Sequence, residues 1–424
     1  MSRIHPTSSV ALLPQFSLWT VPATQESVER DIEYEVRPIS TFSSSTLIRF
    51  EVRSPTNEYV QFSESLFWIK VKFTLSHSTK TKLDVNDWKK VRFRDNLMHS
   101  LFRTVSLSIN GKNVIQSPSL YAFKAWFEAK MGFSDVAKSS HLEAAGYDAV
   151  PHHYFDASHP NEIEIELTGP LHMDLSQQPK ALVGGTDFVL ELVPNDHKFY
   201  VEAENEYSIS KVDFLDTCLY VHRSRVSQAI VDAHNAALLK APARYPFTRC
   251  EVRHMTIASG QNDVILDNIV VGQLPRRMFI ALIENKDFVG GKPFAFDHFD
   301  LNYIVCYRDG LQTPEKAYTP NFKKLAFSRE YLAFYRALNQ NNTDPVINIS
   351  KNSWFKCPIF GFNFAPDLSN GPSLESHVNM REMGHLRVHV KFAESLKQAT
   401  VALMYLEFDS CLEIDVLRNI HVDY

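Results

Sequence analysis

The sequence contains 424 residues with a net charge of −5 at pH 7, and 44% of its residues are hydrophobic while 22% are charged. This length predicts two or three domains, and the composition is that of a folded protein with enough apolar residues for more than one core. The acidic balance and the lack of a Lys/Arg-rich arm argue against a protein that condenses nucleic acid by charge.

Cysteine usage and hydropathy limit the setting in which the chain folds. The five cysteines are scattered and form no CxxC pair. We therefore expect reduced, mostly buried thiols, and neither a disulfide framework nor a structural zinc site. The N-terminus does not resemble a signal peptide, and no stretch reaches the roughly 20 apolar residues that a membrane span needs. We expect a soluble chain that is made in the cytosol and has no membrane span.

The first elements along the chain are an arm and a series of strands. Residues 1–30 are rich in Ser, Thr, Pro and Gln and predict an irregular N-terminal arm. Many later segments alternate apolar and polar residues, which is the period of a half-buried β-strand. In the first half these segments are 46–52, 66–75, 104–109, 162–167, 188–193 and 215–222.

Three segments have helical spacing instead. Residues 121–131 place their aromatic side chains on one face of a helix. Residues 228–240 combine several alanines with the 3.6-residue period, and Pro242 ends the pattern. The third predicted helix covers 329–338.

The order of elements in the first half returns in the second half. In the first half, a strand with a turn at Gly111 precedes an aromatic helix and further strands. In the second half, the strand 301–307 with a turn at Gly310 precedes a helix and the strands 386–392 and 401–408. The two turn glycines are 199 residues apart. One architecture used twice explains this order with a single assumption.

These elements predict an all-β fold. Short strands with frequent turns and few helices are typical of β-sandwiches, and eight strands in each half fit a jelly roll. We therefore predict two tandem eight-stranded jelly-roll β-sandwiches, a double jelly roll, with short inserted helices. The predicted boundaries are an N-terminal arm at 1–30, a first jelly roll at 31–226, a helical connector at 227–244 and a second jelly roll at 245–424.

Motifs with catalytic chemistry are missing from the sequence. It contains no GxGxxG, GxxxxGK[ST], HExxH or GxSxG pattern. His152 and His153 lie close in sequence to Asp156 and His159, so a metal site is conceivable. Adjacent histidines on a strand point to opposite faces, however, which makes shared chelation of one ion the weaker interpretation.

Two charged runs have a structural and a functional interpretation. Glu162, Glu164 and Glu166 fall on one face of a predicted strand. Paired carboxylates can serve acid–base catalysis, but this spacing favours a solvated face or one that meets a basic partner. The cationic run 89–94 favours a solvated surface segment, with nucleic-acid or partner contact as the alternative.

A third polar run lies near the C-terminus. His385, Arg387 and His389 share one face of a predicted strand. This pattern indicates a polar outer face, or else a pH-sensitive or charged contact with a neighbouring subunit. We predict no catalytic, cofactor-binding or metal-binding residues, no cofactor, and no enzymatic activity.

Several sequence segments resemble the major capsid proteins of Polinton/Maverick elements and adintoviruses. Each segment is short, but their order and spacing match this family over nearly the whole chain. The segments are Glu35–Ser40, His99–Phe102, Tyr245–Val252, Leu266–Arg277, Phe296–Asn302, Phe364–Leu368, Gly384–Val388 and Glu413–Asp415.

The resemblance implies a double jelly-roll subunit that acts in a virion. Three copies of such a subunit form a pseudo-hexagonal capsomer, and capsomers tile an icosahedral shell around double-stranded DNA. The implied partners are other copies of the chain, a single jelly-roll penton protein, minor cement proteins, and packaged DNA through non-specific contact only. A shell that a packaging motor fills needs no basic arm, which agrees with the acidic composition.

Other classes of function remain open at this point. One is a domesticated cellular protein of capsid origin, and another is a jelly-roll ligand-binding module similar to a lectin. An enzyme on a cupin-like jelly roll would need a cluster of His and Glu metal ligands in one sandwich, and the sequence shows none. A stable trimer and shell-like particles would distinguish the capsid subunit from these alternatives.

Overall fold

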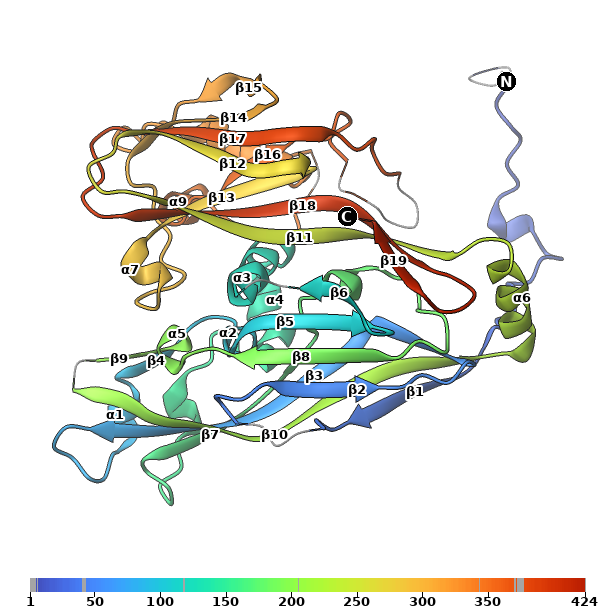
Figure 1. The fold of residues 1–424 in the computed structure, drawn as a ribbon, viewed down its shortest axis with the longest axis horizontal. Helices are drawn as coiled ribbons and strands as arrows, with labels where there is room; N and C mark the ends of the chain where they lie inside the picture. Colours follow the sequence, from blue (N-terminus) through green and yellow to red (C-terminus); the bar gives the residue numbers. More distant parts are fainter. Residues whose placement is uncertain are drawn as a thin grey trace.

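The computed structural model shows two β-sandwiches stacked one above the other, with helices between and beside them (Figure 1). The strands of the first sandwich lie within residues 28–226, and those of the second within 243–423. The structure describes residues 5, 7–39, 43–116, 119–204, 206–342, 344–369, 371 and 377–423.

The first sandwich is built from two four-stranded antiparallel sheets. The β1 sheet has the order β1-β10-β3-β7, and the β2 sheet has the order β2-β8-β5-β6. A short ribbon of β4 and β9 lies at one end. The strands are β1 (Val28–Val36), β2 (Ile48–Val52), β3 (Glu58–His77), β4 (Val91–Phe93), β5 (Phe102–Ile109), β6 (Lys112–Gln116), β7 (Glu162–Gly169), β8 (Phe188–Pro194), β9 (Val201–Ala203) and β10 (Tyr207–Val226).

The second sandwich has the same design with one added strand. The β11 sheet has the order β11-β18-β13-β16, with β19 paired to β18, and the β12 sheet has the order β12-β17-β14-β15. The strands are β11 (Ala243–Ile257), β12 (Asp263–Gln273), β13 (Arg277–Glu284), β14 (Leu301–Arg308), β15 (Leu311–Tyr318), β16 (Phe360–Asn363), β17 (Met383–Phe392), β18 (Thr400–Ile414) and β19 (Ile420–Asp423).

Short helices connect the strands. The three predicted helices are confirmed as α3, α6 and α8, and the remaining helical segments have six residues or fewer. The α-helices are α1 (Val85–Trp88), α2 (Leu97–Ser100), α3 (Tyr121–Gly132), α4 (Asp135–Lys138), α5 (His197–Tyr200), α6 (Gln228–Leu238), α7 (Asn285–Phe288), α8 (Ser328–Ala337) and α9 (Lys351–Lys356). The 3₁₀ helices are η1 (Pro14–Phe16), η2 (His141–Ala145), η3 (Pro151–Tyr154) and η4 (Asp174–Gln177).

The strand order identifies both sandwiches as jelly rolls. Leaving out the β4–β9 ribbon and β19, each sandwich joins its first, eighth, third and sixth strands in one sheet. The second, seventh, fourth and fifth strands form the facing sheet. This is the eight-stranded, two-sheet arrangement of a jelly roll. The predicted fold, a double jelly roll with inserted helices, is confirmed.

The predicted internal repeat is visible in matching turns. Asn110 and Gly111 join β5 to β6, and Asp309 and Gly310 join β14 to β15. All four residues have positive φ, from 45° to 86°. A tight hairpin turn with positive φ at both central residues follows the right-handed twist of the flanking strands, and Asn-Gly and Asp-Gly are the residue pairs that it favours.

Alternating side chains explain the core. In β3, the side chains of Phe67, Ile69, Val71 and Phe73 are fully buried between the sheets, while the residues between them reach the outer face. Two such rows of apolar side chains from facing sheets interdigitate and form the core of a sandwich. Strand β1, in contrast, was not predicted, and it begins at Val28 within the segment expected to be an arm.

Candidate functional site

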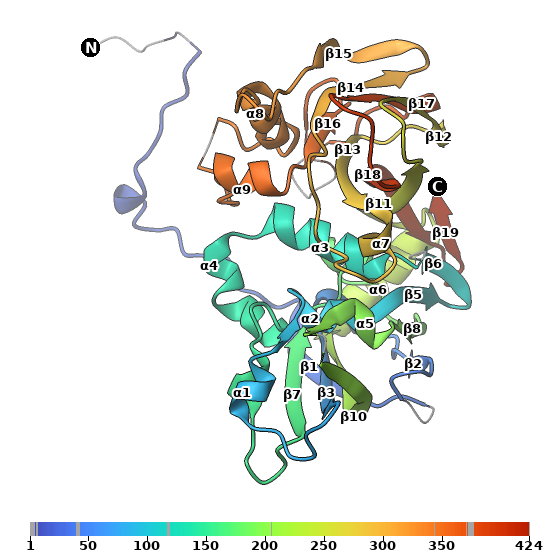
Figure 2. The ribbon, with the colours of Figure 1, turned by 90° about the vertical axis from the view of Figure 1, so that its left-hand side faces the viewer.

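Helix α3 forms the junction between the two sandwiches. It follows β6 of the first sandwich, and it contacts β5 on one side and β11 of the second sandwich on the other. Figure 2 shows it between the two sandwiches. Ten of its twelve residues are buried, because it is covered on both sides.

Aromatic rings hold this junction together. Phe123 stacks on Phe288, with ring centroids 5.3 Å apart, and Trp126 lies 4.6 Å from Phe296. Phe127 stacks on Tyr405 of β18 at 5.6 Å. Aromatic pairs at these separations contribute beyond the apolar area that they bury. The two sandwiches are therefore packed firmly against each other through α3.

A network of charged side chains lies beneath these rings. Lys124 and Glu128, one turn apart on α3, are both buried, and the Lys124 ammonium forms an ion pair with Asp174. Lys124 Nζ lies 3.8 Å from Glu128 Oε1. His172 Nδ1 lies 2.7 Å from Glu128 Oε2, and the Tyr405 hydroxyl donates to Glu128 Oε1 at 3.2 Å. Glu128 thus connects residues from both sandwiches.

Burial and charge pairing act in opposite directions on this network. Burial alone raises the pKa of Glu128, but Lys124 and His172 more than offset it, and the pKa falls below its ordinary value. Burial raises the pKa of Asp174 and is only partly offset by Lys124. Because a buried charge without a partner is costly, the network depends on the Lys124 ammonium.

One group of described residues at this junction has ligand atoms close enough together to hold a metal ion: Glu128, Asp174 and Cys250. Two features oppose that use. The Lys124 ammonium already supplies a cation to both carboxylates. Burial also raises the pKa of the Cys250 thiol well above its usual range, whereas metal ligation needs the thiolate. The cluster fits an ion-pair network that locks the sandwiches together better than a metal centre.

Sequence reasoning missed this network. A trace of it is present in the sequence, because Lys124 and Glu128 interrupt an otherwise apolar helix at i, i+4 spacing. Their partners could not be predicted. Asp174 lies 50 residues away in η4, and Tyr405 lies 277 residues from Glu128, in the other sandwich.

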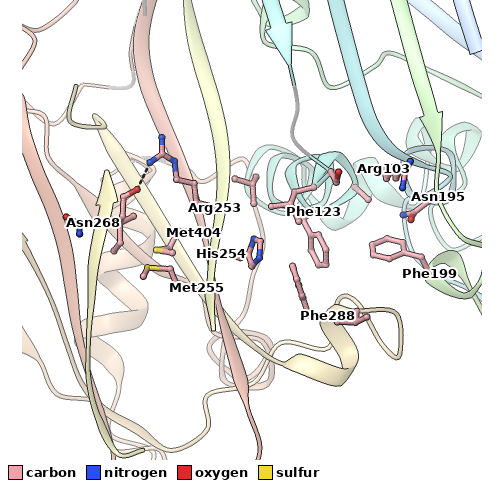
Figure 3. Close-up of a pocket in the computed structure, with 16 residues that line it drawn as sticks. Arg103, Phe123, Asn195, Phe199, Arg253, His254, Met255, Asn268, Phe288 and Met404 are labelled. Carbon is pink, nitrogen blue, oxygen red and sulfur yellow. Dashed lines mark hydrogen bonds between the residues drawn. The ribbon is translucent and has the colours of Figure 1, made fainter. Parts of the chain in front are cut away.

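A cavity with a volume of about 760 Å³ opens at the same junction (Figure 3). The rings of Phe123, Phe199 and Phe288 converge on it from α3, α5 and α7, with His254 of β11 beside them. Arginine, asparagine, serine and histidine provide its polar groups, and no carboxylate or thiol is among its lining residues. The lining therefore suits an apolar segment and offers no pair of groups for acid–base chemistry.

The three glutamates of β7 form an exposed ladder with β3. Lys70 pairs with Glu164 at 2.6 Å and Lys72 with Glu162 at 3.3 Å, while the Trp68 indole donates to Glu166 at 2.7 Å. The predicted solvated face is confirmed. These carboxylates are satisfied by their cross-strand neighbours and do not converge on a pocket.

The histidine face of β17 is also on the outside. His385 and Arg387 are exposed, whereas Leu386 and Val388 are buried between the sheets. His389 Nε2 lies 2.5 Å from Asp263 Oδ1 on the neighbouring strand β12. The polar outer face is confirmed, and its contact with a neighbouring subunit remains a prediction.

The other predicted features lie on the surface. His152 and His153 are in η3 and not on a strand; their rings are 4.6 Å apart, and they do not belong to the candidate metal group of the described residues. The cationic run 89–94 spans β4, where Lys90 and Arg94 pair with Glu204 and Glu202 of the adjacent segment. The five cysteines, which are free as predicted, are not on the surface: Cys218 and Cys306 are buried, whereas the other three are only partly buried.

The described part of the N-terminal arm extends away from the two sandwiches (Figure 1). Seven large apolar residues are more than half exposed, and Trp19 is 89% exposed. They are Val10, Leu12, Leu13, Phe16, Leu18, Trp19 and Val21. Among the described residues, no helix has the length and apolar character required to cross a membrane.

Comparison with known proteins places this fold among viral capsid proteins. The structure is similar to that of the Sputnik virophage, with a TM-score of 0.61 and 12% identity over 100% of this chain and 94% of the other. The Faustovirus major capsid protein has a TM-score of 0.61 at 9% identity, over 93% of this chain and 92% of the other. The mavirus major capsid protein has a TM-score of 0.51 at 10% identity, over 100% of this chain and 97% of the other. At these identities the likeness establishes the fold.

The sequence comparisons add one relative. No protein-family model matches the chain. An uncharacterised protein of Caenorhabditis elegans is 24% identical over 348 residues, which cover 78% of this chain and 81% of that protein. The chain is thus a double jelly-roll protein of the architecture seen in viral major capsid proteins, with a sequence relative in an animal.

Proposed function

We propose that this protein is a major capsid protein, a structural subunit without enzymatic activity that acts in a virion. The observation that carries the proposal is the duplicated strand order in one chain. It is combined with similarity to viral capsid structures over nearly the full length of both partners. A fold alone does not define a function, so the proposal also uses the sequence segments that resemble Polinton/Maverick and adintovirus capsid proteins.

The duplicated architecture supports a trimer. Two similar sandwiches in each chain give six in a three-fold assembly, so a trimer fits a lattice in which each capsomer has six neighbours. We propose that such pseudo-hexameric capsomers build an icosahedral shell around double-stranded DNA. The acidic net charge favours DNA contact that is non-specific and weak. A single jelly-roll penton protein and minor cement proteins would complete the shell.

One observation favours a second candidate function. The relative in Caenorhabditis elegans is a protein of an animal and not of a virus. A capsid gene that entered an animal genome and acquired a cellular role would explain this relationship. In that case the fold and the trimer would be retained, but closed particles would not form.

The decisive experiment is assembly of the purified full-length protein. We expect light scattering to give about three times the 48.6 kDa mass of one chain, and negative-stain images to show shell fragments or closed particles. A trimer that never forms larger particles over a range of salt and pH would favour the domesticated protein. A strictly monomeric chain under all these conditions would contradict the capsid proposal.

A further inference from the structure

The contact between the two sandwiches suggests how a second copy binds. Within one chain, the helix inserted between the fifth and sixth strands of the first sandwich, α3, packs against β11, the first strand of the second sandwich. The equivalent helix of the second sandwich is α8, and the equivalent first strand is β1. In Figure 2, α8 lies in the upper sandwich and β1 in the lower one, so the two do not meet within one chain.

The described residues cover helix α8 on one side only. Phe334 is fully buried, and its ring centroid lies 6.2 Å from that of Phe279 on β13. On the opposite side, Arg329, Leu332 and Arg336 are exposed, and Leu332 keeps 56% of its surface accessible. Residues spaced by three and four share one face of a helix. The open face of α8 therefore presents a leucine between two arginines.

Both arginines lack an acidic partner within the described chain. Arg329 donates to the carbonyl oxygens of Lys316 and Ala317 and lies over the Tyr318 ring, and neither it nor Arg336 forms an ion pair with a described carboxylate. Their charge is thus free to attract an acidic surface on another molecule.

Strand β1 provides such a surface. Its outward-facing residues, Glu29, Asp31, Glu33 and Glu35, are all acidic and exposed. Asp31 lies 3.7 Å from His222 and Glu35 pairs with Arg37, but Glu29 and Glu33 have no ion-pair partner among the described residues. Four like charges on one face of a strand repel one another unless an opposite charge approaches.

We propose that the open face of α8 binds the acidic face of β1 on a second copy of this chain. The contact repeats between copies the relation that α3 and β11 have within one copy, and it joins two different surfaces, so that it can close into a ring. This inference rests on the proposed capsid function and specifies the subunit interface. Charge complementarity sets the partner, and Leu332 supplies an apolar centre between the arginines.

Charge reversal of each face tests the interface. The first variant carries Glu29→Lys, Asp31→Lys and Glu33→Lys, the second carries Arg329→Glu and Arg336→Glu, and the third combines all five changes. We expect mass photometry to show trimers for the wild type, single chains for the first and second variants, and recovery of the trimer in the third. Recovery requires direct pairing, because two independent defects would add.

A matched control reverses two cations elsewhere. Lys89→Glu and Arg92→Glu alter exposed residues at the β4 ribbon, and we expect this variant to remain trimeric. Circular dichroism melting establishes that each variant is folded. If a charge-reversed variant fails to fold, Leu332→Ser tests the same face with a neutral change, and we expect a larger fraction of single chains at equal concentration.

The outcomes separate this interface from the capsid proposal. A wild-type protein that is monomeric under all conditions overturns the trimer itself, and the interface with it. A wild-type trimer that persists in folded first and second variants overturns only the α8–β1 contact. Trimers that are lost in both variants but not recovered in the third also contradict direct pairing of the two faces.

Discussion

Helices α3 and α8 occupy the same place in the two jelly rolls but lie in different surroundings. Both follow the fifth strand and precede the sixth. Helix α3 is buried on nearly all sides, between β5 and the second sandwich, whereas α8 packs on β16 and leaves one face open to solvent. The two jelly rolls share one strand order, but their equivalent helices differ in how much of their surface the rest of the described chain covers.

The first strands of the two sandwiches show the same divergence. Strand β11 packs against α3 of the first sandwich, and the sulfur of its Cys250 lies within 4.8 Å of carboxylate oxygens of Glu128 and Asp174. Strand β1 lacks such a partner among the described residues, and the outward-facing residues Glu29, Asp31, Glu33 and Glu35 are acidic. An interface that is always occupied can be apolar and aromatic. A face that must stay soluble until it meets another molecule carries charge instead.

The largest predicted effect concerns the charged network beneath α3. Lys124→Met removes the ammonium beside Glu128 and leaves Asp174 buried without a cation, so we expect the free energy of unfolding to fall by about 3–5 kcal/mol. Lys356→Met, which replaces an exposed lysine of α9 in the second sandwich, should change it by less than about 0.5 kcal/mol. Urea unfolding measures both. Equal losses of unfolding free energy in the two variants would show that the buried Lys124 ammonium stabilises the fold no more than an exposed lysine does.

A smaller effect is expected from the hydroxyl that joins the sandwiches. Tyr405→Phe leaves the ring in place but removes the donor to Glu128, which should cost about 1.5–3 kcal/mol because the acceptor is charged and buried. Tyr331→Phe on α8 removes a donor to the Ile349 carbonyl and should cost only about 1 kcal/mol. A larger loss for the α8 variant would reverse the comparison.

The junction also predicts a pH dependence. Burial holds the pKa of His99 well below its ordinary value, so the unfolded chain binds a proton at His99 at a higher pH than the folded chain. The contribution of neutral His99 to the free energy of unfolding is therefore complete above the unfolded pKa of about 6.5. It decreases as the pH falls below that value. Between pH 7 and pH 5, the melting temperature should decrease less in the His99→Gln variant than in the wild type. The exposed-site variant His421→Gln should behave as the wild type does.

The smallest effect should come from the exposed ladder of β7 and β3. Glu164→Gln removes a surface ion pair with Lys70. Because exposed pairs are screened by water and salt, we expect the melting temperature to change by no more than about 1 °C. A change as large as that of Lys124→Met would show that the outer face of the β1 sheet is not simply solvated.

Much of the fold could be predicted from local pattern. The alternation in β3 and β10 and the paired turns at Gly111 and Gly310 are local features, and a half-buried strand or a tight hairpin leaves such a trace directly in the sequence. Strand β1 escaped prediction because its alternation is between acidic residues and only partly buried apolar ones. The strand lies at the edge of its sheet, where its apolar residues are only partly covered.

The functional features depend on contacts that no local pattern encodes. Lys124 and Glu128 could be noticed as charges within an apolar helix, but nothing near them in sequence indicates Asp174 or Tyr405. The open face of α8 is likewise an outcome of packing. Its amphipathic pattern predicts a helix with one buried side, and only the structure shows that no element of the described residues covers the other side.

The exposed arm gives the molecule a built-in optical reporter. Trp19 is 89% exposed, while the indoles of Trp88, Trp126 and Trp354 are buried and Trp68 is partly covered. An indole in water emits at longer wavelength than one in an apolar site. The long-wavelength edge of the tryptophan emission therefore belongs mainly to the arm. A shift of this edge to shorter wavelength during particle assembly would show when another molecule covers the arm. No attached dye would be needed.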